Sequence, residues 1–270
     1  MKKPEKEKSN GLVLPGLPVQ LESLNKEEDA IRTKSILHIN AYPDLKTHLE
    51  IIHASLNVLF CLSIDYNNQT EDEQTIQFLG IRLFNTIVIS LNLLLTGYYQ
   101  GSAFTQRDIL ETGFLLDYFT LDPSKISEWR DSNEKERSTN FKPVVIRKAL
   151  DARDGVKQKK REKRYKLFCN AAAHPTYKGF QLLAPNGMVK IGPFFNERFL
   201  KSTFEELVMR LPLFTLIFVQ HFKNLPPEFL KIQIEYITLL KPWMEQYYGL
   251  DLSNIDTKDF NAVLELLQED

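Results

Sequence analysis

Apolar residues recur at spacings of three and four over most of the chain, which is the periodicity of amphipathic helices. The clearest stripe runs from Pro43 to Ile64, and a nearly continuous apolar segment follows at residues 74–99. A segment that is apolar nearly all round is typical of the central helix of a bundle. The pattern predicts an all-α, multi-helix bundle with further helices over residues 23–38, 102–121, 124–130, 196–222, 227–248 and 256–268.

Two segments depart from this helical periodicity. The first 22 residues are charged and then rich in glycine and proline, so we expect a flexible N-terminal tail before a single helical domain over residues 23–270. Residues 180–192 alternate between apolar and polar positions around a Pro-Asn-Gly turn at 185–187, which predicts a small β-hairpin. Residues 131–164 are dense in charge, and we interpret them as an exposed helix and a connection.

Composition and charge exclude several classes of protein. The 34 basic and 35 acidic residues nearly cancel, so binding to nucleic acid or to an anionic membrane would need a local patch. The apolar segments at 83–99 and 211–219 fall short of a membrane span, which indicates buried core helices and no membrane contact. The only cysteines are Cys61 and Cys169, and the charged N-terminus lacks a secretory signal, so we expect a cytoplasmic protein.

The run from Lys157 to Arg164 has the sharpest charge asymmetry in the chain, with six basic residues and one acidic residue. A solvated helix face is the interpretation that we favour. A patch that contacts RNA or phosphate is the alternative. The candidate contacts of such a patch are Lys159, Lys160, Arg161 and Arg164.

A polar pair stands in an otherwise small and apolar stretch, because Asn170 and His174 are separated by three alanines and followed by Pro175. Residues four apart share one face of a helix. An imidazole there could donate or accept a proton near neutrality, and the neighbouring amide could orient it or hold a phosphate oxygen. The alternative is that both residues cap the helix end and bond to neighbouring backbone.

The segment Cys169-Asn170-Ala-Ala-Ala-His174-Pro175 resembles the motif helix of HEPN-like proteins. Active members of that family have an arginine, often followed by asparagine, and a histidine five positions after the arginine. Cys169 stands in the arginine position here. The segment Gln106 to Glu111 resembles the arginine-and-glutamate helix of an uncharacterised HEPN-like branch, whose members show a small residue in place of the arginine. The resemblance covers about residues 45–222, with C-terminal helices following at 227–270.

The resemblance implies an all-α bundle that forms a symmetric homodimer and uses no cofactor or metal. Active members are ribonucleases, so it also implies RNA processing or bacterial defence, such as a toxin-antitoxin or phage-defence role. The candidate catalytic residues that it indicates are His174, Arg107, Asn170 and Glu111. The reaction needs a base or acid, which His174 could provide, and a cation near the phosphate, which Cys169 cannot provide. Arg107 or Arg164 would have to replace that cation.

Two functions therefore remain open. His174 beside the basic run favours a HEPN-like, metal-independent endoribonuclease. Cys169 in the arginine position favours a non-catalytic helical module that has kept the scaffold and binds a protein partner, a nucleotide or RNA. We favour a degenerate HEPN-like member without robust ribonuclease activity. Arg107 and Glu111 are one turn apart, so they either form an internal ion pair or aim Arg107 toward His174.

Three weaker candidates complete the survey. Glu50 and His53 match half of a di-metal site, but the second half is missing, so we interpret His48 and His53 as surface residues. Catalysis by Cys169 beside His174 is less favoured than a small buried cysteine. The aromatic pairs Tyr98-Tyr99 and Tyr247-Tyr248 could stack on bases, although edges of the core are the favoured interpretation.

Overall fold

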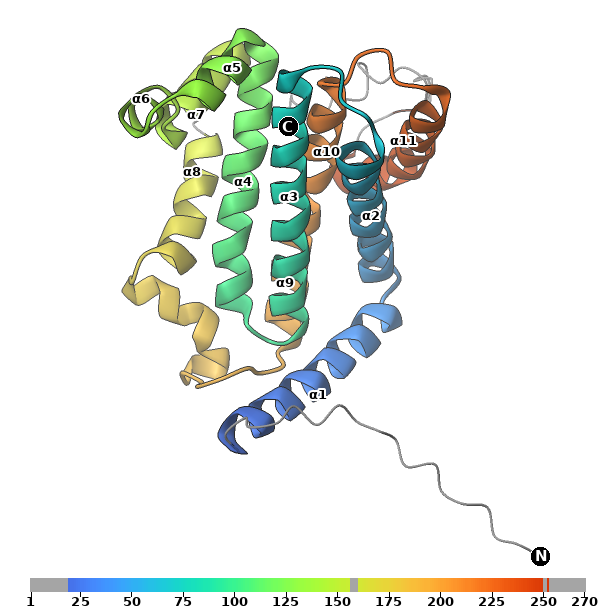
Figure 1. Cartoon of the computed structure of the whole chain (residues 1–270). Helices are drawn as coiled ribbons and strands as arrows, with labels where there is room; N and C mark the ends of the chain where they lie inside the picture. Colours follow the sequence, from blue (N-terminus) through green and yellow to red (C-terminus); the bar gives the residue numbers. More distant parts are fainter. Residues whose placement is uncertain (1–18, 156–159, 250–251, 253–270) are drawn as a thin grey trace, which may run out of the picture.

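A computed structural model describes residues 19–155, 160–249 and 252 of the chain. These residues form helices and loops with no strand among them, which confirms the predicted all-α, multi-helix architecture. At the centre of the bundle α3 (Glu71–Leu95) and α4 (Tyr99–Leu121) pack along each other over their length (Figure 1).

The N-terminal helices frame one side of this central pair. Helix α1 (Val19–Ala41) begins before the predicted boundary at residue 23, and residues 1–18 lie outside the described part of the chain. Helix α2 (Pro43–Phe60) starts with Pro43, whose missing N–H costs no hydrogen bond in a first turn. It continues into a short π-helix, η1 (Cys61–Asp65). In Figure 1, α1 runs obliquely past one end of the bundle.

The close packing of a C-terminal helix against α3 and α4 depends on one glycine in each of these two helices. Helix α10 (Leu211–Gln220) crosses α4 at Gly113, where an added Cβ would lie 2.4 Å from the Phe214 ring. At Gly80 of α3, a Cβ would lie 2.4 Å from the Phe218 ring. Side-chain atoms at these two positions would therefore separate α10 from both central helices.

The predicted helix at 124–130 is present as α5 (Ser124–Asp131). Where one exposed helix and a connection were predicted over 131–164, the chain forms three helices, α6 (Glu134–Asn140), α7 (Pro143–Arg153) and α8 (Lys160–Phe168). Helix α8 lies along α4 and continues into a second π-helix, η2 (Cys169–Ala173). Residues 156–159, between α7 and α8, lie outside the described part of the chain.

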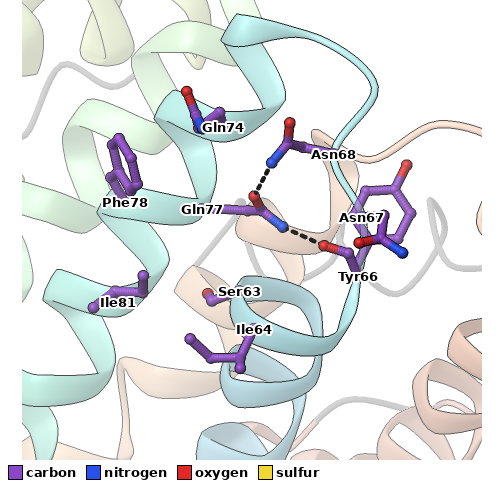
Figure 2. A pocket seen from close by; sticks show the side chains of 9 residues that line it. All are labelled: Ser63, Ile64, Tyr66, Asn67, Asn68, Gln74, Gln77, Phe78 and Ile81. Atoms are coloured by element: carbon purple, nitrogen blue, oxygen red, sulfur yellow. Dashed lines mark hydrogen bonds between the residues drawn. The ribbon is translucent and has the colours of Figure 1, made fainter.

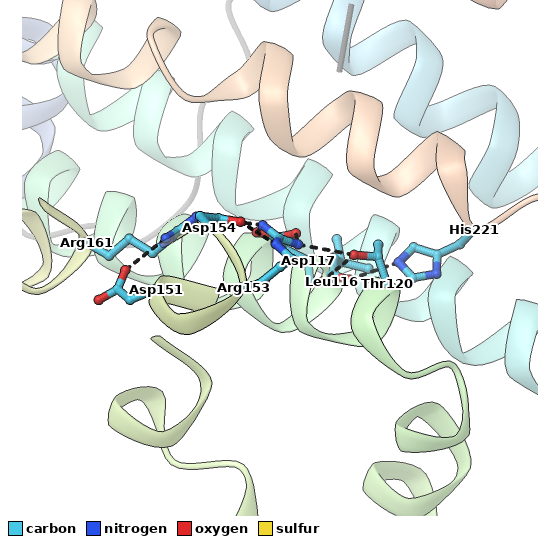
Figure 3. Close-up of polar contacts among 8 residues, drawn as sticks. All are labelled: Leu116, Asp117, Thr120, Asp151, Arg153, Asp154, Arg161 and His221. Carbon is cyan, nitrogen blue, oxygen red and sulfur yellow. Dashed lines mark hydrogen bonds and ion pairs between the residues drawn. The ribbon is translucent and has the colours of Figure 1, made fainter. Parts of the chain in front are cut away.

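A buried ion-pair network holds α7 and α8 against α4 (Figure 3). The carboxylate of Asp117 is 3% exposed and accepts from Nη1 and Nη2 of Arg153 at 2.6 and 3.1 Å. Asp154 pairs with Arg153 and Arg161, and Asp151 accepts from Arg161 at 2.8 Å. Burial raises the pKa of Asp117, although Arg153 opposes the shift. The network fixes the position of the helix that carries Tyr165 and leads to His174.

The predicted β-hairpin at 180–192 is wrong. The chain forms two 3₁₀ helices there, η3 (Tyr177–Leu183) and η4 (Pro185–Gly187). The turn chemistry was interpreted correctly, because Asn186 and Gly187 both have positive φ, at 59° and 82°. A single backbone hydrogen bond, from Lys190 N to Leu183 O at 2.8 Å, joins the flanking segments. One such bond does not make a ladder, and an isolated two-stranded hairpin is marginal in water.

The C-terminal helices cover the remaining side of the core. The predicted helix over 196–222 is two helices, α9 (Glu197–Val208) and α10, because the chain turns just before Pro212. Helix α11 (Pro227–Tyr248) continues through Pro242 and ends at Gly249, which has the left-handed conformation common after helices. The predicted helix at 256–268 lies outside the described residues.

The core is one contiguous cluster of aliphatic and aromatic side chains, most of them from α2, α3, α4, α9, α10 and α11, with a few from α1, α5, α7 and α8. Two segments, Pro43–Asp65 and Glu71–Leu95, are long and apolar enough to span a membrane by length and composition. In the second of these, Leu83, Ile87 and Leu94 are fully buried in the core.

Candidate functional site

Arg107 and Glu111 lie one turn apart on α4 and form an ion pair with each other. Nε and Nη2 of Arg107 donate to Oε1 of Glu111 at 3.1 and 2.8 Å. Each side chain is a little more than a quarter exposed. The sequence left two roles for Arg107 and Glu111, an internal ion pair or an Arg107 aimed toward His174. The structure shows the internal ion pair.

Tyr165 of α8 closes the pair into a three-residue cluster. Its hydroxyl group donates to Oε1 of Glu111 at 2.6 Å and accepts from Nε of Arg107 at 3.2 Å. Burial, and then the hydrogen bond and charge of Glu111, raise the pKa of Tyr165 to about 12. The phenol is therefore neutral near physiological pH and adds no negative charge to the cluster.

Arg147 of α7 lies against the same tyrosine, and sequence reasoning did not single it out. Its guanidinium carbon is 4.0 Å from the centroid of the Tyr165 ring, and that of Arg107 is 5.3 Å away. Arg147 is 7% exposed, and its Nη1 has no hydrogen-bond acceptor among the described residues. The available signal was an arginine beside Ile146 on the apolar face of the segment 143–153.

Asn170 and His174 are exposed at the far end of α8, in and just after η2. The backbone N–H of His174 donates to the carbonyl oxygen of Cys169 at 2.9 Å, and the Thr176 hydroxyl group donates to the carbonyl oxygen of Asn170. Backbone groups of both residues thus belong to the helix end, but their side chains do not make the bonds to neighbouring backbone that the capping alternative expects among the described residues. Within the described residues, neither the imidazole nor the Asn170 amide group has a hydrogen-bond partner.

The chain direction separates His174 from Arg107. Helix α8 runs antiparallel to α4, because Tyr165 contacts Arg107 while Ala171 O, further along, accepts from Gln100 Nε2 at 3.3 Å. His174 follows Tyr165 by roughly 13 Å of helix rise. The structure therefore brings Arg107 together with Glu111, and Asn170 with His174. No described hydrogen bond or ion pair joins the two pairs.

The basic run before this segment is partly neutralised by the protein itself. Arg161 is held by Asp151 and Asp154 in the network of Figure 3, and Arg164 Nε lies 3.6 Å from Glu206 Oε1. Lys160 is exposed at the start of α8, whereas Lys159 lies outside the described residues. Arg161 is therefore committed to the fold and is a poor candidate for an RNA contact.

A second basic region lies beside His174. No Asp or Glu occurs between Glu162 and Glu197, although the chain has 35 acidic residues among 270. Within that interval, Lys178 and Lys190 are exposed and have no ion-pair partner in the described structure. The sequence already shows this absence of acidic residues. The alternating segment inside the interval was interpreted only as a hairpin, so the basic region was missed.

Large apolar side chains accompany these lysines. Tyr177 is 89% exposed and Phe180 is 51% exposed, and their rings meet edge to face with centroids 6.1 Å apart. Ile191 is fully exposed as well. We call the exposed side chains of residues 174–191 the His174–Ile191 surface.

The His174–Ile191 surface has a fixed base on the bundle. Gln100 Nε2 donates to the carbonyl oxygen of Gly179 at 2.9 Å as well as to that of Ala171. An added Cβ at Gly179 would lie 3.1 Å from Ala171 O, so η3 packs closely on η2. The surface is therefore positioned by α4 next to Asn170 and His174.

The prediction that His48 is a surface residue is wrong, whereas His53 is exposed as expected. His48 is 2% exposed, and its Nδ1 accepts from Trp243 Nε1 at 3.0 Å. The sequence placed His48 next to a strong apolar stripe, but α11 covers it from a distant part of the chain. Within the described residues, no three His, Cys, Asp or Glu side chains gather as metal ligands.

The remaining candidates belong to the packing of the protein. Cys169 is buried, in agreement with the favoured interpretation of a small core residue. Tyr99 is buried and its hydroxyl group accepts from Asn196 N at 3.0 Å, while Tyr98 donates to Glu28 at 2.7 Å. Tyr248 donates to the carbonyl oxygen of Met209. Tyr99 therefore lies inside the core, while Tyr98 and Tyr248 are held at its edge by bonds to the protein, so these tyrosines do not form a base-stacking platform.

A cavity of about 400 Å³ lies between η1, the loop that follows it and the start of α3, away from the predicted site residues (Figure 2). Gln77 crosses it, donating to the carbonyl oxygens of Leu62 and Tyr66 at 2.9 and 2.8 Å and accepting from Asn68 Nδ2 at 2.8 Å. The polar groups of Gln77 are therefore used to hold the loop between η1 and α3.

Comparison of the chain with protein-family models, curated proteins and solved structures finds no match. The HEPN-like resemblance therefore depends on the motif residues alone. Within the described residues, the geometry adds an exposed His174 with no bond to Arg107, an adjacent aromatic and basic surface, and a separate arginine cluster.

Proposed function

We propose that this protein is a HEPN-like helical module that binds single-stranded RNA on the His174–Ile191 surface and does not cleave it. The observation that carries the proposal is that exposed Tyr177 and Phe180 share a segment with exposed Lys178 and Lys190, which have no ion-pair partner among the described residues, and that this segment follows the motif residues Asn170 and His174. Single-stranded nucleic acids are bound by such combinations, because bases stack on aromatic rings while cations contact the phosphates.

The local charge supports RNA as the ligand despite the balanced total. The net charge of the chain is −1, so no global attraction to a polyanion exists. Lys178 and Lys190 lie between Glu162 and Glu197, an interval without Asp or Glu. No carboxylate close to them in sequence would therefore repel a bound phosphate. A phosphate chain that follows this interval would meet cations without competing acids.

The absence of cleavage follows from what surrounds His174. Phosphodiester cleavage needs a proton-transfer group and a cation that stabilises the developing charge. Cys169 occupies the motif arginine position and is buried, while Arg107 donates to Glu111 and Tyr165. The imidazole of His174 therefore has no described guanidinium partner with which to act.

Binding to a fluorescein-labelled single-stranded RNA, measured by fluorescence anisotropy, tests the proposal. Replacement of both Tyr177 and Phe180 with alanine should weaken binding by at least ten-fold, because stacking contributes about 1–3 kcal/mol per base. The matched control is Phe60→Ala, which removes a partly exposed ring at the end of α2, outside this surface. Equal affinity of the double variant and the wild type would overturn the proposed binding surface.

A cleavage assay on the same RNA tests the second half of the proposal. The wild type and His174→Ala should leave the RNA equally intact. Cleavage by the wild type that is lost in His174→Ala would replace the proposal with an active ribonuclease. Binding to anionic lipid vesicles without binding to RNA would assign the surface to membranes instead.

A second function, contact with another copy of the chain, is favoured by a separate group of exposed apolar residues. Phe78, Val88 and Ile89 of α3 are exposed by 62, 41 and 51% and lie on one side of the helix, together with the exposed polar residues Arg82 and Asn85. Light scattering should then give a dimer for the wild type and a monomer for Ile89→Asp. A wild-type monomer at working concentrations would exclude this homodimer.

A further inference from the structure

The guanidinium group of Arg147 is a buried charge without a counterion in the described structure. Arg147 is 7% exposed, no carboxylate of the described residues forms an ion pair with it, and its Nη1 lacks an acceptor. Its only described polar compensation is the face of the Tyr165 ring at 4.0 Å. A buried charge that lacks a hydrogen-bonded partner is strongly unfavourable, so this arrangement is suited to an additional anion.

The neighbouring carboxylate is already used. Glu111 accepts from Arg107 and from the Tyr165 hydroxyl group, all through Oε1. Tyr165 is neutral, so the charges of Arg107, Arg147 and Glu111 sum to one net positive charge. The cluster as a whole therefore attracts an anion.

The geometry gives that anion a route and a second contact. Arg107 lies at the hydroxyl edge of Tyr165, while Arg147 lies against the ring, so both guanidinium groups border the same side chain. Nε and Nη2 of Arg107 are occupied, which leaves Nη1 free of any described bond. Because Arg107 and Glu111 are each more than a quarter exposed, this edge of the cluster meets solvent.

We propose that Arg147, with Arg107 as the second contact, forms a binding site for a small phosphate or phosphate monoester. Guanidinium groups bind phosphate through paired, charge-assisted hydrogen bonds, and two of them around one anion match its charge and its several acceptor oxygens. This site is distinct from the His174–Ile191 surface, since it lies where α7 and α8 meet the middle of α4.

Thermal unfolding with inorganic phosphate, at constant ionic strength set with sodium chloride, tests the site. A phosphate concentration of about ten times Kd should raise the Tm of the wild type by about 3 °C. Arg147→Met keeps much of the side-chain volume but removes the charge and the donors, so its Tm should not respond to phosphate. Arg137→Met removes an exposed arginine on α6 and is the matched control, which should respond like the wild type.

Two further measurements keep the test decisive if Arg147→Met does not fold. Arg147→Lys retains the charge but loses the planar donor fork, so it should weaken the phosphate response at least ten-fold in concentration. A wild-type crystal soaked in tungstate should show the anion bound to Arg147. An equal Tm response in wild type and Arg147→Lys, or tungstate bound only elsewhere, would overturn the site.

The same variants show which phosphate compound binds better and whether the phosphate site is independent of RNA binding. A nucleoside 5′-monophosphate that raises Tm at lower concentration than inorganic phosphate would identify a nucleotide as the better ligand. The reverse order would identify the free anion. RNA affinity should be unchanged in Arg147→Lys, so failure of the RNA proposal and failure of this site give different results.

Discussion

The indole N–H of Trp243 donates to Nδ1 of His48 at 3.0 Å and thereby joins α11 to α2 inside the core. His48 must be unprotonated at Nδ1 to accept this bond. Its ring also lies 4.5 Å from that of Tyr247. Burial, which outweighs the opposing charge of Asp44, lowers the pKa of His48 to about 4.

The stability of the protein should therefore fall in mild acid. The unfolded chain binds a proton at this position near pH 6.5, whereas the folded protein resists protonation until about pH 4. Stability is thus fully present above pH 6.5 and is lost as the pH falls through this window, by roughly 3 kcal/mol for this group. The ring of His221 is half-buried and bonded to Leu116 O; desolvation lowers its pKa to about 4, which acts in the same direction.

Urea unfolding between pH 7 and pH 4 measures this effect. His48→Asn keeps an acceptor for Trp243 without a titrating ring, so its stability should fall less steeply with acid. His53→Asn changes an exposed histidine one turn further along and should follow the wild type. A wild-type slope in His48→Asn would show that this imidazole is not the acid-sensitive group.

Replacement of Asp117 with asparagine should destabilise the protein by about 2–3 kcal/mol, because Arg153 would lose a buried counterion. Chemical denaturation at pH 7 measures the loss. The control is Lys26→Ala, which removes an exposed ion pair with Glu22 and should change stability by less than about 0.5 kcal/mol. Similar small losses in both variants would contradict a structural role for the network of Figure 3.

Two glycines of α4 should respond oppositely to alanine. At Gly113 the new Cβ would lie 2.4 Å from the Phe214 ring, and overpacking should cost about 1–3 kcal/mol. At Gly101 the closest atom, Leu93 Cδ1, is 3.4 Å away, so the higher helix propensity of alanine should stabilise the protein by up to about 1 kcal/mol. Thermal unfolding of both variants gives the comparison, and a stabilised Gly113→Ala would contradict the close contact between α4 and α10.

The salt dependence of RNA binding should report the lysines of the His174–Ile191 surface. Each phosphate contact contributes about 0.7 to the slope of log affinity against log salt for a single strand. Lys178→Ala and Lys190→Ala should each reduce the slope by about that amount. Lys231→Ala, on α11, should leave it unchanged. Slopes equal to the wild type in both surface variants would remove these lysines from the interface.

The sequence was most informative where one helix face decided the structure. The stripe from Pro43 onward and the segment over 102–121 correspond to α2 and α4. Their spacing places apolar side chains on one side of a helix, and this does not depend on which element packs against that side. The hairpin failed for the opposite reason. Asn186 and Gly187 do form a turn, but strands need a ladder of hydrogen bonds, and alternation of apolar residues alone does not supply one.

The candidate site was predictable only within one helix. Spacing on α4 correctly placed Arg107 beside Glu111. The contact of that pair with Tyr165, and of Tyr165 with Arg147, depends on how three helices cross, which no local pattern contains. The separation of His174 from Arg107 likewise follows from the antiparallel course of α8 and α4.

The first helix has a consequence for local opening of the native state. Helix α1 buries only Ile31, Ser35 and Ile39 among its described side chains. Its other contacts are partly exposed, such as the bonds of Arg32 to Asn92 at 2.8 Å and of Tyr98 to Glu28 at 2.7 Å, and the ring contact of His38 with Phe195. It can thus detach while the remaining core stays closed. Its amide protons should exchange with deuterated solvent through a low-energy opening, well before those of α3, whose exchange requires the bundle itself to come apart.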